Sequence, residues 1–304
     1  MAGHTQVLAA LDTMREKKYL GDFGSRTKHL GKYGKRECDK NMKKICFAIL
    51  VHENREVIQD QIENIRYFCP NSSIVFFQSG NDDNLCKGLG YPICPTSHPM
   101  KYGRTYGWFF FNIMEWLENT GYEYDYLINL DSDSLFAKKG FEEFIISEMN
   151  EFDYMAAHYR MATEHWFPGN TMKKVWHLWQ PIFNMDHFYG CFGSQVFSRK
   201  FVKQTLSFNK LEEMKRIMKQ TEDDVLALEE MLFATLAKTL GVKSKPYPAN
   251  VGKWMRDRPK YRRRELINAV KNNEECYLLH PVNRFMNDPA RTFIRSMVHS
   301  GKKE

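Results

Sequence analysis

The stretch "YLINLDSDSLF", residues 126–136, decides the fold. It begins as an apolar run and passes directly into Asp131, Ser132 and Asp133. An apolar run of this length is typical of a buried strand, whereas two neighbouring carboxylates repel each other and are costly to bury. A buried strand that ends in such a pair requires something that offsets the negative charge.

The chain before this stretch predicts alternating strands and helices. Residues 45–52 and 73–80 are short apolar runs, which indicate strands. Residues 54–68 and 107–119 carry apolar side chains at helical spacing. Together with the strand that leads to the two aspartates, this order predicts an α/β fold with a mostly parallel sheet flanked by helices.

Polar residues follow the predicted strands and form a candidate ligand site. In such sheets ligands bind outside the carboxyl ends of the strands. Arg104 precedes the second helix and stands between glycines, which allow a close backbone approach. The candidate ligand-binding residues of this edge are Val51, His52, Glu53, Gln78, Arg104, Asp131 and Ser132.

The two aspartates also form a candidate metal site. Alternate residues of an extended chain point the same way, so Asp131 and Asp133 converge on one point beyond the sheet. Carboxylate oxygens are the ligands that Mg²⁺ and Mn²⁺ prefer. The alternative is a solvated turn in which each aspartate bonds its own backbone. The apolar strand in front of the pair favours the metal site.

The second half of the chain is less regular. Residues 153–159 and 276–282 predict further strands. Residues 221–241 predict one helix, with Thr221 as its N-cap and Gly241 just past its end. Five aromatic residues in the region between them can stack on a sugar ring or fill the core: Trp166, Trp176, Trp179, Phe183 and Tyr189.

The net charge of +7 is unevenly distributed. Residues 1–44 hold 11 Lys/Arg against 5 Asp/Glu, and residues 251–304 hold 13 against 6, so the middle of the chain sums to −6. A basic tail beside an acidic centre favours an anionic ligand such as a phosphate ester, although for residues 1–44 a solvated terminus is the preferred interpretation. Arg258 and Lys260, in the densest basic run, are the candidates to hold phosphate groups.

We expect three parts in the chain. These are a basic N-terminal helix and arm (1–44), a catalytic domain (45–285) and a C-terminal extension (286–304). Seven scattered cysteines without a CxxC pair, and an N-terminus unlike a signal peptide, predict a cytoplasmic protein. No apolar run reaches the ~20 residues of a membrane span, so any membrane contact would be peripheral, through the basic tails.

The order of these elements resembles a glycosyltransferase of the GT-A fold, over residues 45–285. In that group a D-x-D motif binds a divalent metal, which bridges the diphosphate of a nucleotide sugar, and in several members a late histidine completes the metal shell. The resemblance implies that Asp131, Asp133 and His280 bind Mn²⁺ or Mg²⁺. It also implies a nucleotide-sugar donor, with UDP favoured, and a carbohydrate, glycosylated small molecule or protein as acceptor. For His280 the alternative is a structural residue at the end of its strand.

Two segments are also similar to the family of core-2 N-acetylglucosaminyltransferases and peptide xylosyltransferases. They are "MKYGRTYGWFFFNIMEWLENTGYEYDYLINLDSD" (100–133) and "EEMLFATLAKTLG" (229–241). The catalytic base of that family maps onto Glu230, in the middle of the predicted helix, with Glu229 and Asp224 in reserve. That family transfers hexosyl or pentosyl groups with inversion, needs no metal and lacks a D-x-D, so this chain departs from it at the motif.

Two other functions compete with a glycosyltransferase. A phosphohydrolase of the haloacid dehalogenase type also places D-x-D after a strand, but its first aspartate stands early in the domain, whereas two strand–helix stages precede it here. A nucleic-acid-binding protein would explain the basic tails but not a buried strand ending in two aspartates. We therefore expect no nucleic-acid partner.

Overall fold

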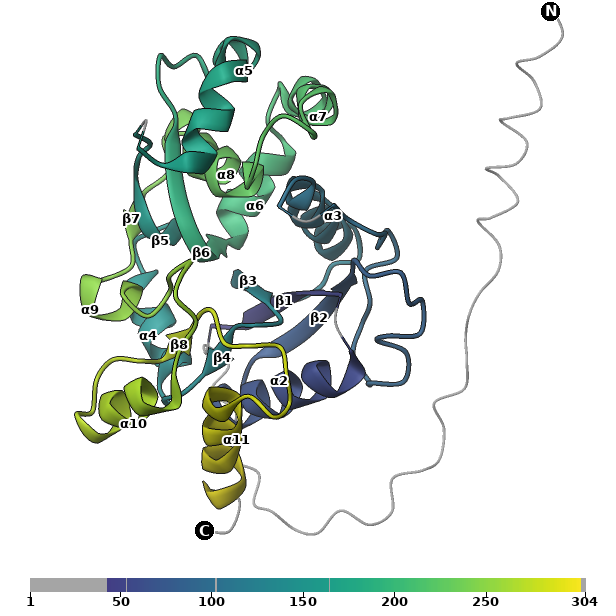
Figure 1. Ribbon diagram of the computed structural model, residues 1–304. Helices are drawn as coiled ribbons and strands as arrows, with labels where there is room; N and C mark the ends of the chain where they lie inside the picture. Colours follow the sequence, from purple (N-terminus) through teal and green to yellow (C-terminus); the bar gives the residue numbers. More distant parts are fainter. Residues whose placement is uncertain (1–42, 53, 102, 164, 302–304) are drawn as a thin grey trace, which may run out of the picture. The chain divides into compact units, whose positions relative to one another are not determined.

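The computed structural model describes residues 43–52, 54–101, 103–163 and 165–301. The described residues belong to one compact unit, drawn in colour in Figure 1. The predicted N-terminal helix, and the arm up to residue 42, lie outside the described residues, and so does Glu53.

The centre of this unit is a six-stranded sheet in the order β2-β1-β3-β6-β5-β7. Strand β1 pairs in parallel with both β2 and β3, and β5 pairs in parallel with β7. Strand β6 runs antiparallel to β3 and β5. The sheet is therefore mixed but mostly parallel, as predicted. The strands are β1 (Ile45–Val51), β2 (Ser73–Gln78), β3 (Tyr126–Asp131), β5 (Tyr154–Met161), β6 (Tyr189–Ser198) and β7 (Ser244–Pro246).

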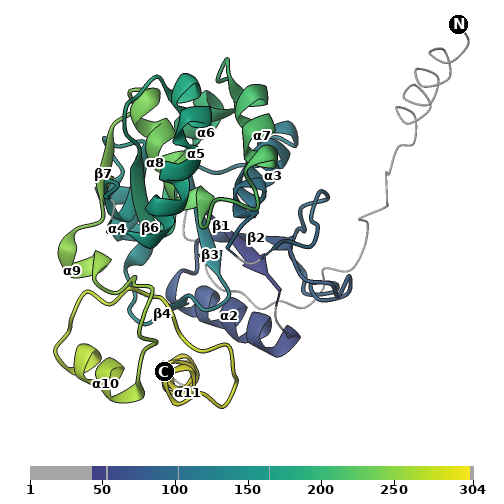
Figure 2. The ribbon, with the colours of Figure 1, turned by 45° about the horizontal axis from the view of Figure 1, so that its top comes forward.

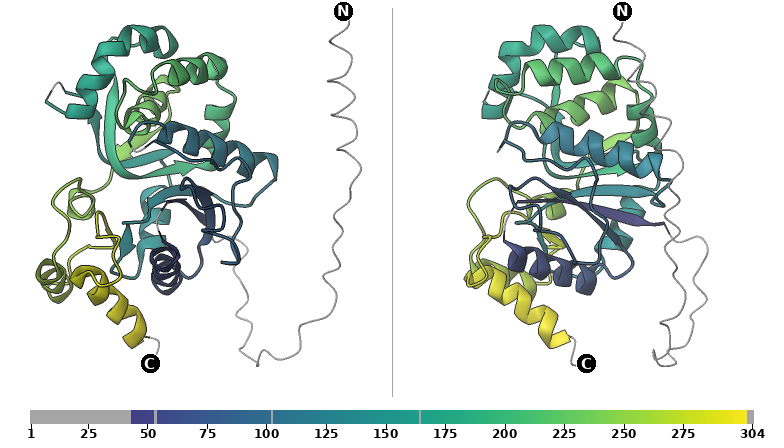
Figure 3. Two further views of the ribbon diagram at one scale, coloured as in Figure 1. Left: turned by 45° about the vertical axis from the view of Figure 1, so that its right-hand side comes forward. Right: turned by 90° about the vertical axis from the view of Figure 1, so that its right-hand side faces the viewer.

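Helices cover both faces of the sheet (Figures 2 and 3). Helices α2 and α11 lie on one side of the sheet, and α3 and α8 lie on the other. The helices are α2 (Arg55–Phe68), α3 (Tyr106–Asn119), α4 (Phe141–Glu148), α5 (Phe167–Phe183), α6 (Arg199–Leu206), α7 (Leu211–Gln220), α8 (Leu228–Thr239), α9 (Ala249–Gly252), α10 (Arg263–Lys271) and α11 (Pro289–Gly301).

The alternation of side chains along β1 builds a core on each face. Ile45, Phe47, Ile49 and Val51 join the core beneath α2 and α11, and Cys46, Ala48 and Leu50 join the core beneath α3 and α8. All seven side chains are buried, which explains why β1 reads as a continuous apolar run.

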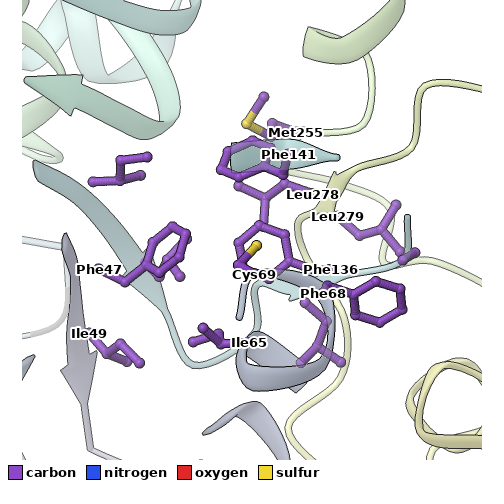
Figure 4. Packing of buried hydrophobic residues seen from close by; sticks show 14 of the residues in the cluster. Phe47, Ile49, Ile65, Phe68, Cys69, Phe136, Phe141, Met255, Leu278 and Leu279 are labelled. Carbon is purple, nitrogen blue, oxygen red and sulfur yellow. The ribbon is translucent and has the colours of Figure 1, made fainter. Parts of the chain in front are cut away.

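A second, two-stranded sheet follows the D-x-D motif directly. Its strands are β4 (Leu135–Phe136) and β8 (Leu278–Leu279), which pair antiparallel. The Phe136 ring lies 5.3 Å from Phe47 and 5.0 Å from Phe141, in the group of side chains that Figure 4 shows. Each such aromatic contact contributes about 0.5–1.5 kcal/mol beyond burial, so the chain after the motif is firmly held.

One predicted helix is divided in the structure. Thr221 ends α7, its hydroxyl donating to the Ile217 carbonyl at 2.8 Å, instead of beginning a helix. Helix α8 begins only at Leu228, because Ala227 adopts the left-handed conformation with φ of 50°. Gly241, with φ of 64°, lies just past the helix end as predicted. The prediction of one helix over residues 221–241 was therefore wrong at its beginning.

The six described cysteines are free and buried, as expected for reduced thiols. None of the described helices combines the length and the apolar character that crossing a bilayer requires.

Candidate functional site

A cavity of about 480 Å³ lies at the carboxyl ends of β1 and β3. Strand β2 lies on one side of β1 and β3 on the other, so this is the point where the strand order reverses and where ligands bind in such sheets. The lining includes eight of the predicted residues, namely His52, Asp131, Asp133, Glu229, Glu230, Arg258, Lys260 and His280.

The crevice opens because β3 and β6 separate. Their pairing ends at Ile128 and Val196. Beyond it the Asn129 side chain takes the place of a backbone partner and accepts a hydrogen bond from the Gln195 amide at 2.7 Å. Both residues line the cavity. An asparagine inside an apolar strand is the sequence signal for this gap, and its role was not predicted.

The backbone of the motif is fully tied down. The Asp131 carbonyl accepts from the Ser134 amide at 2.9 Å, which closes a tight turn. The Ser132 carbonyl accepts from Arg291 at 3.1 Å, and the Asp133 carbonyl accepts from the Val282 amide at 2.8 Å. Each backbone acceptor from Asp131 to Asp133 is therefore satisfied, so the carboxylates are held in one geometry.

A polar stripe on α2 holds the motif from below. The Gln61 amide donates to the Asp131 and Ser134 carbonyls at 2.7 and 3.0 Å. The Asn64 side chain bonds both the N–H and the C=O of Phe136, at 2.7 and 2.8 Å. Gln61 and Asn64 lie at helical spacing beside the apolar face of α2. Their partners are about 70 residues away in the chain, so the role of the two residues could not be predicted from the local sequence.

His280 completes a candidate metal group with the two aspartates. One ligand atom from each of Asp131, Asp133 and His280 lies within 4.8 Å of the others. The His280 Nε2 atom is 3.3 Å from the Asp133 carboxylate and 3.9 Å from the Asp131 carboxylate. The His280 Nδ1 atom lies 3.0 Å from the Arg256 carbonyl, so it carries a proton and Nε2 faces the carboxylates.

Charge and burial act in opposite directions on the pair. Burial, and then the neighbouring Asp133, raise the pKa of Asp131. Burial also pushes the pKa of Asp133 upward, but the adjacent His280 imidazole and the charge of Arg284 outweigh it, so that pKa is lowered. The Arg284 guanidinium lies 3.2 Å from the Asp133 carboxylate. Asp133 is only 6% exposed, which does not fit a solvated turn.

The donor set suits a divalent cation. The Asp133 Oδ1 atom is buried and lies within ion-pair distance of His280 and Arg284, yet no partner in the described chain is aligned with it for a hydrogen bond. Two carboxylates and one imidazole nitrogen match the preference of Mn²⁺, and the carboxylates also match that of Mg²⁺.

Two neighbouring carboxyl groups line the same cavity, of which Glu229 is buried and Glu230 is half-buried. Glu229 and Glu230 lie in the first turn of α8, not in mid-helix as predicted. Burial raises the pKa of Glu229 to about 8, and burial together with the charge of Glu229 raises that of Glu230 well above its usual range. The Glu229 Oε2 atom is buried without a hydrogen-bond partner in the described chain, so it offers a free polar group to a ligand.

Five predicted residues do not line the cavity. The Val51 side chain belongs to the core, Asp224 is exposed, and the Gln78 side chain accepts from the Cys86 amide at 3.2 Å. Arg104 donates to the Asp223 carbonyl at 2.7 Å, which holds the turn before α8. Ser132 is buried and accepts from Arg284 at 3.0 Å.

Among the aromatic candidates, Trp166 lines the cavity. Trp176, Trp179 and Phe183 are buried along α5 as core residues. Besides Asn129, further lining residues were not predicted, because no local pattern marks them: Tyr106, Gln195 and Arg284.

No family model and no curated protein matches the sequence. Among solved structures, the galactosyltransferase LgtC in complex with donor and acceptor sugar analogues is similar with 10% identity and a TM-score of 0.45, covering 84% of this chain and 95% of that one. An active-site variant of LgtC is similar with 12% identity and a TM-score of 0.46, covering 84% of this chain and 95% of that one. The mannosyltransferase Ktr4p from S. cerevisiae is similar with 9% identity and a TM-score of 0.43, covering 68% of this chain and 69% of that one.

Proposed function

We propose that this protein is a metal-assisted glycosyltransferase that moves a sugar from a nucleotide diphosphate to an acceptor hydroxyl. The observation that carries the proposal is the cluster of Asp131, Asp133 and His280 in the same cavity as Glu229 and Glu230. The cavity volume of about 480 Å³ lies within the roughly 300–1,000 Å³ usual for small-molecule sites.

Asp131, Asp133 and His280 would hold Mn²⁺ or Mg²⁺. When bound, such a cation would neutralise phosphate charge as the bond between sugar and diphosphate breaks. Asp133 is the more buried of the two acids and has the lowered pKa, so its carboxyl group would be ionised before a cation binds. His280 presents Nε2 because Nδ1 faces the Arg256 carbonyl.

Three cations would stabilise the departing diphosphate. Arg258, Lys260 and Arg284 line the same cavity. Lys260 is oriented by the Asn283 side chain, to which it donates at 2.7 Å, and Arg284 by Ser132. Fixed cations directed at developing negative charge lower the barrier without reorganising during the reaction.

Glu230 would act as the general base, with Glu229 as its alternative. A base must be deprotonated, yet burial raises the pKa of both groups in the ligand-free protein. A bound cation and the side chain of Arg258 in the same cavity would favour the charged form. The pair would then deprotonate the acceptor hydroxyl as it attacks the sugar.

The proposal also includes the donor nucleotide, the transferred group and the location of the protein in the cell. The donor nucleotide is UDP, the transferred group is a hexosyl or pentosyl unit, and the protein is cytoplasmic. The division into residues 1–44, 45–285 and 286–304 also remains a proposal.

A thermal-shift panel of nucleoside diphosphates, with and without Mn²⁺, tests the proposal. We expect one nucleotide to raise the melting temperature only when Mn²⁺ is present, because binding to the native state stabilises it. The Asp133→Asn variant should lose that shift. A protein that ignores every nucleotide and hydrolyses an aryl phosphate would instead be a phosphohydrolase.

A further inference from the structure

A second cavity of about 220 Å³ adjoins the first. Trp166, Phe192 and Asp257 line both cavities, so the two share a wall. The second cavity is smaller than the roughly 300 Å³ at which drug-sized sites begin, and its size suits one ring-sized group. Arg160 lines the second cavity but not the first.

The shared wall is built by a close contact of backbone and indole. A Cβ atom added at Gly190 would collide with the six-membered ring of Trp166, so the ring lies directly on the glycine backbone. Gly190 pairs with Arg160 across strands β6 and β5. The same strand pair therefore positions both the aromatic wall and the arginine.

Strand β5 is irregular where it lines the second cavity. The pairing with β6 shifts register between Ala157 and Arg160, and His158 there has a φ of 54°. Its ring Nε2 lies 3.2 Å from the Met255 carbonyl, which ties β5 to the loop bearing Arg256. Bulges and strained residues of this kind often re-aim side chains at binding sites.

Among the described residues, no counter-ion pairs with Arg160, which distinguishes it from the other arginine of the second cavity. Arg256 makes two bonds of 2.9 Å to the Glu265 carboxylate, so its charge is already balanced. No carboxylate in the described part of the chain pairs with Arg160. A guanidinium with free donors is suited to bind a carboxylate or phosphate through two parallel hydrogen bonds.

We infer that the second cavity is the acceptor site, and that the acceptor is a saccharide bearing an anionic group. The apolar face of its ring would lie against Trp166 and Phe192, and Arg160 would bind its carboxylate or phosphate. The shared wall brings the acceptor beside Glu230, whose carbonyl accepts from the Cys191 thiol at 3.2 Å. This inference rests on the proposed function and specifies its substrate class.

Binding of simple sugars tests the inference. Glucose, glucuronate and glucose 6-phosphate are titrated by calorimetry into the full chain saturated with UDP and Mn²⁺. We expect both anionic sugars to bind at least tenfold more tightly than glucose. The stronger of the two identifies the anion as carboxylate or phosphate.

Three variants locate the anion. Arg160→Ala should remove the preference for anionic sugars, and Arg160→Lys should keep part of it. Arg216→Ala, a change of an exposed arginine on α7, should keep all of it. The shift produced by UDP and Mn²⁺ should persist in Arg160→Ala.

Three results would overturn the inference. They are equal binding of glucose and glucuronate, no binding of either anion, and equal behaviour of the Arg160→Ala and Arg216→Ala variants. If UDP and Mn²⁺ do not bind at all, the proposed function fails. The sugars are then titrated into the chain alone, and a lost anion preference in Arg160→Ala would still support a separate anion site.

Discussion

The ion pair between Arg291 and Asp60 should be among the most sensitive positions of the fold. Arg291 is fully buried and donates to the Asp60 carboxylate at 2.6 Å, to the Asn283 carbonyl at 2.8 Å and to the Ser132 carbonyl at 3.1 Å. One side chain of α11 thereby joins α2, the C-terminal segment and the D-x-D motif.

The change Arg291→Met removes all three bonds while keeping most of the packing volume. It leaves the Asp60 carboxylate buried without its charge partner, which typically costs about 3–5 kcal/mol. A free energy of this size should lower the melting temperature by roughly 6–15 °C in a chain of this length.

Urea denaturation of the wild type, Arg291→Met, Asp60→Asn, the double variant and one control measures the effect. Asp60→Asn removes the buried charge, so the double variant should be more stable than the sum of the two single losses implies, by about 1–3 kcal/mol. Arg295→Met, on the same helix, is the matched control. Its half-buried guanidinium bonds to Met286 alone among the described residues, so we expect a loss below about 1.5 kcal/mol. The reasoning fails if Arg291→Met costs no more than this control.

Three further changes test the site. Asp133→Asn should weaken Mn²⁺ binding at least tenfold in calorimetry, whereas the exposed Asp83→Asn should not, and equal affinities would exclude Asp133 as a ligand. Because the pKa of Glu229 rises from an ordinary 4.5 to about 8, the folded state holds its proton longer than the unfolded state. The ionisation of Glu229 therefore costs no stability below pH 4.5. Between pH 4.5 and pH 8 it lowers the free energy of unfolding by up to about 5 kcal/mol. Glu229→Gln without metal should flatten that decline in melting temperature, and an unchanged slope would contradict the shift. Gly190→Ala should displace the Trp166 ring, cost about 1–3 kcal/mol and abolish sugar binding while UDP and Mn²⁺ still bind.

Much of the fold could be predicted because its signals are local. Strand β1 is buried on both faces, so its run of apolar residues indicated a strand directly. Helix α2 showed its apolar side at a period that depends only on the chain itself. The candidate metal group could also be predicted from the sequence, since its aspartates end a strand and His280 ends another apolar run.

The remaining features depend on contacts far apart in the sequence. The break between α7 and α8 rests on one left-handed residue, Ala227, which has no distinctive sequence signal. Arg284 meets Ser132 across 152 positions, and Arg291 meets Asp60 across 231. Such pairs follow from the folded arrangement and not from any local pattern.

The tightly held motif backbone has a consequence for how a cation would be retained. The carbonyls from Asp131 to Asp133 already accept hydrogen bonds, and the candidate ligands that the described residues offer a metal are three side chains, those of Asp131, Asp133 and His280. An octahedral ion has six positions, so about half of its shell must come from water or substrate oxygens. The cation and the nucleotide should therefore bind synergistically, each strengthening the affinity for the other by the same factor.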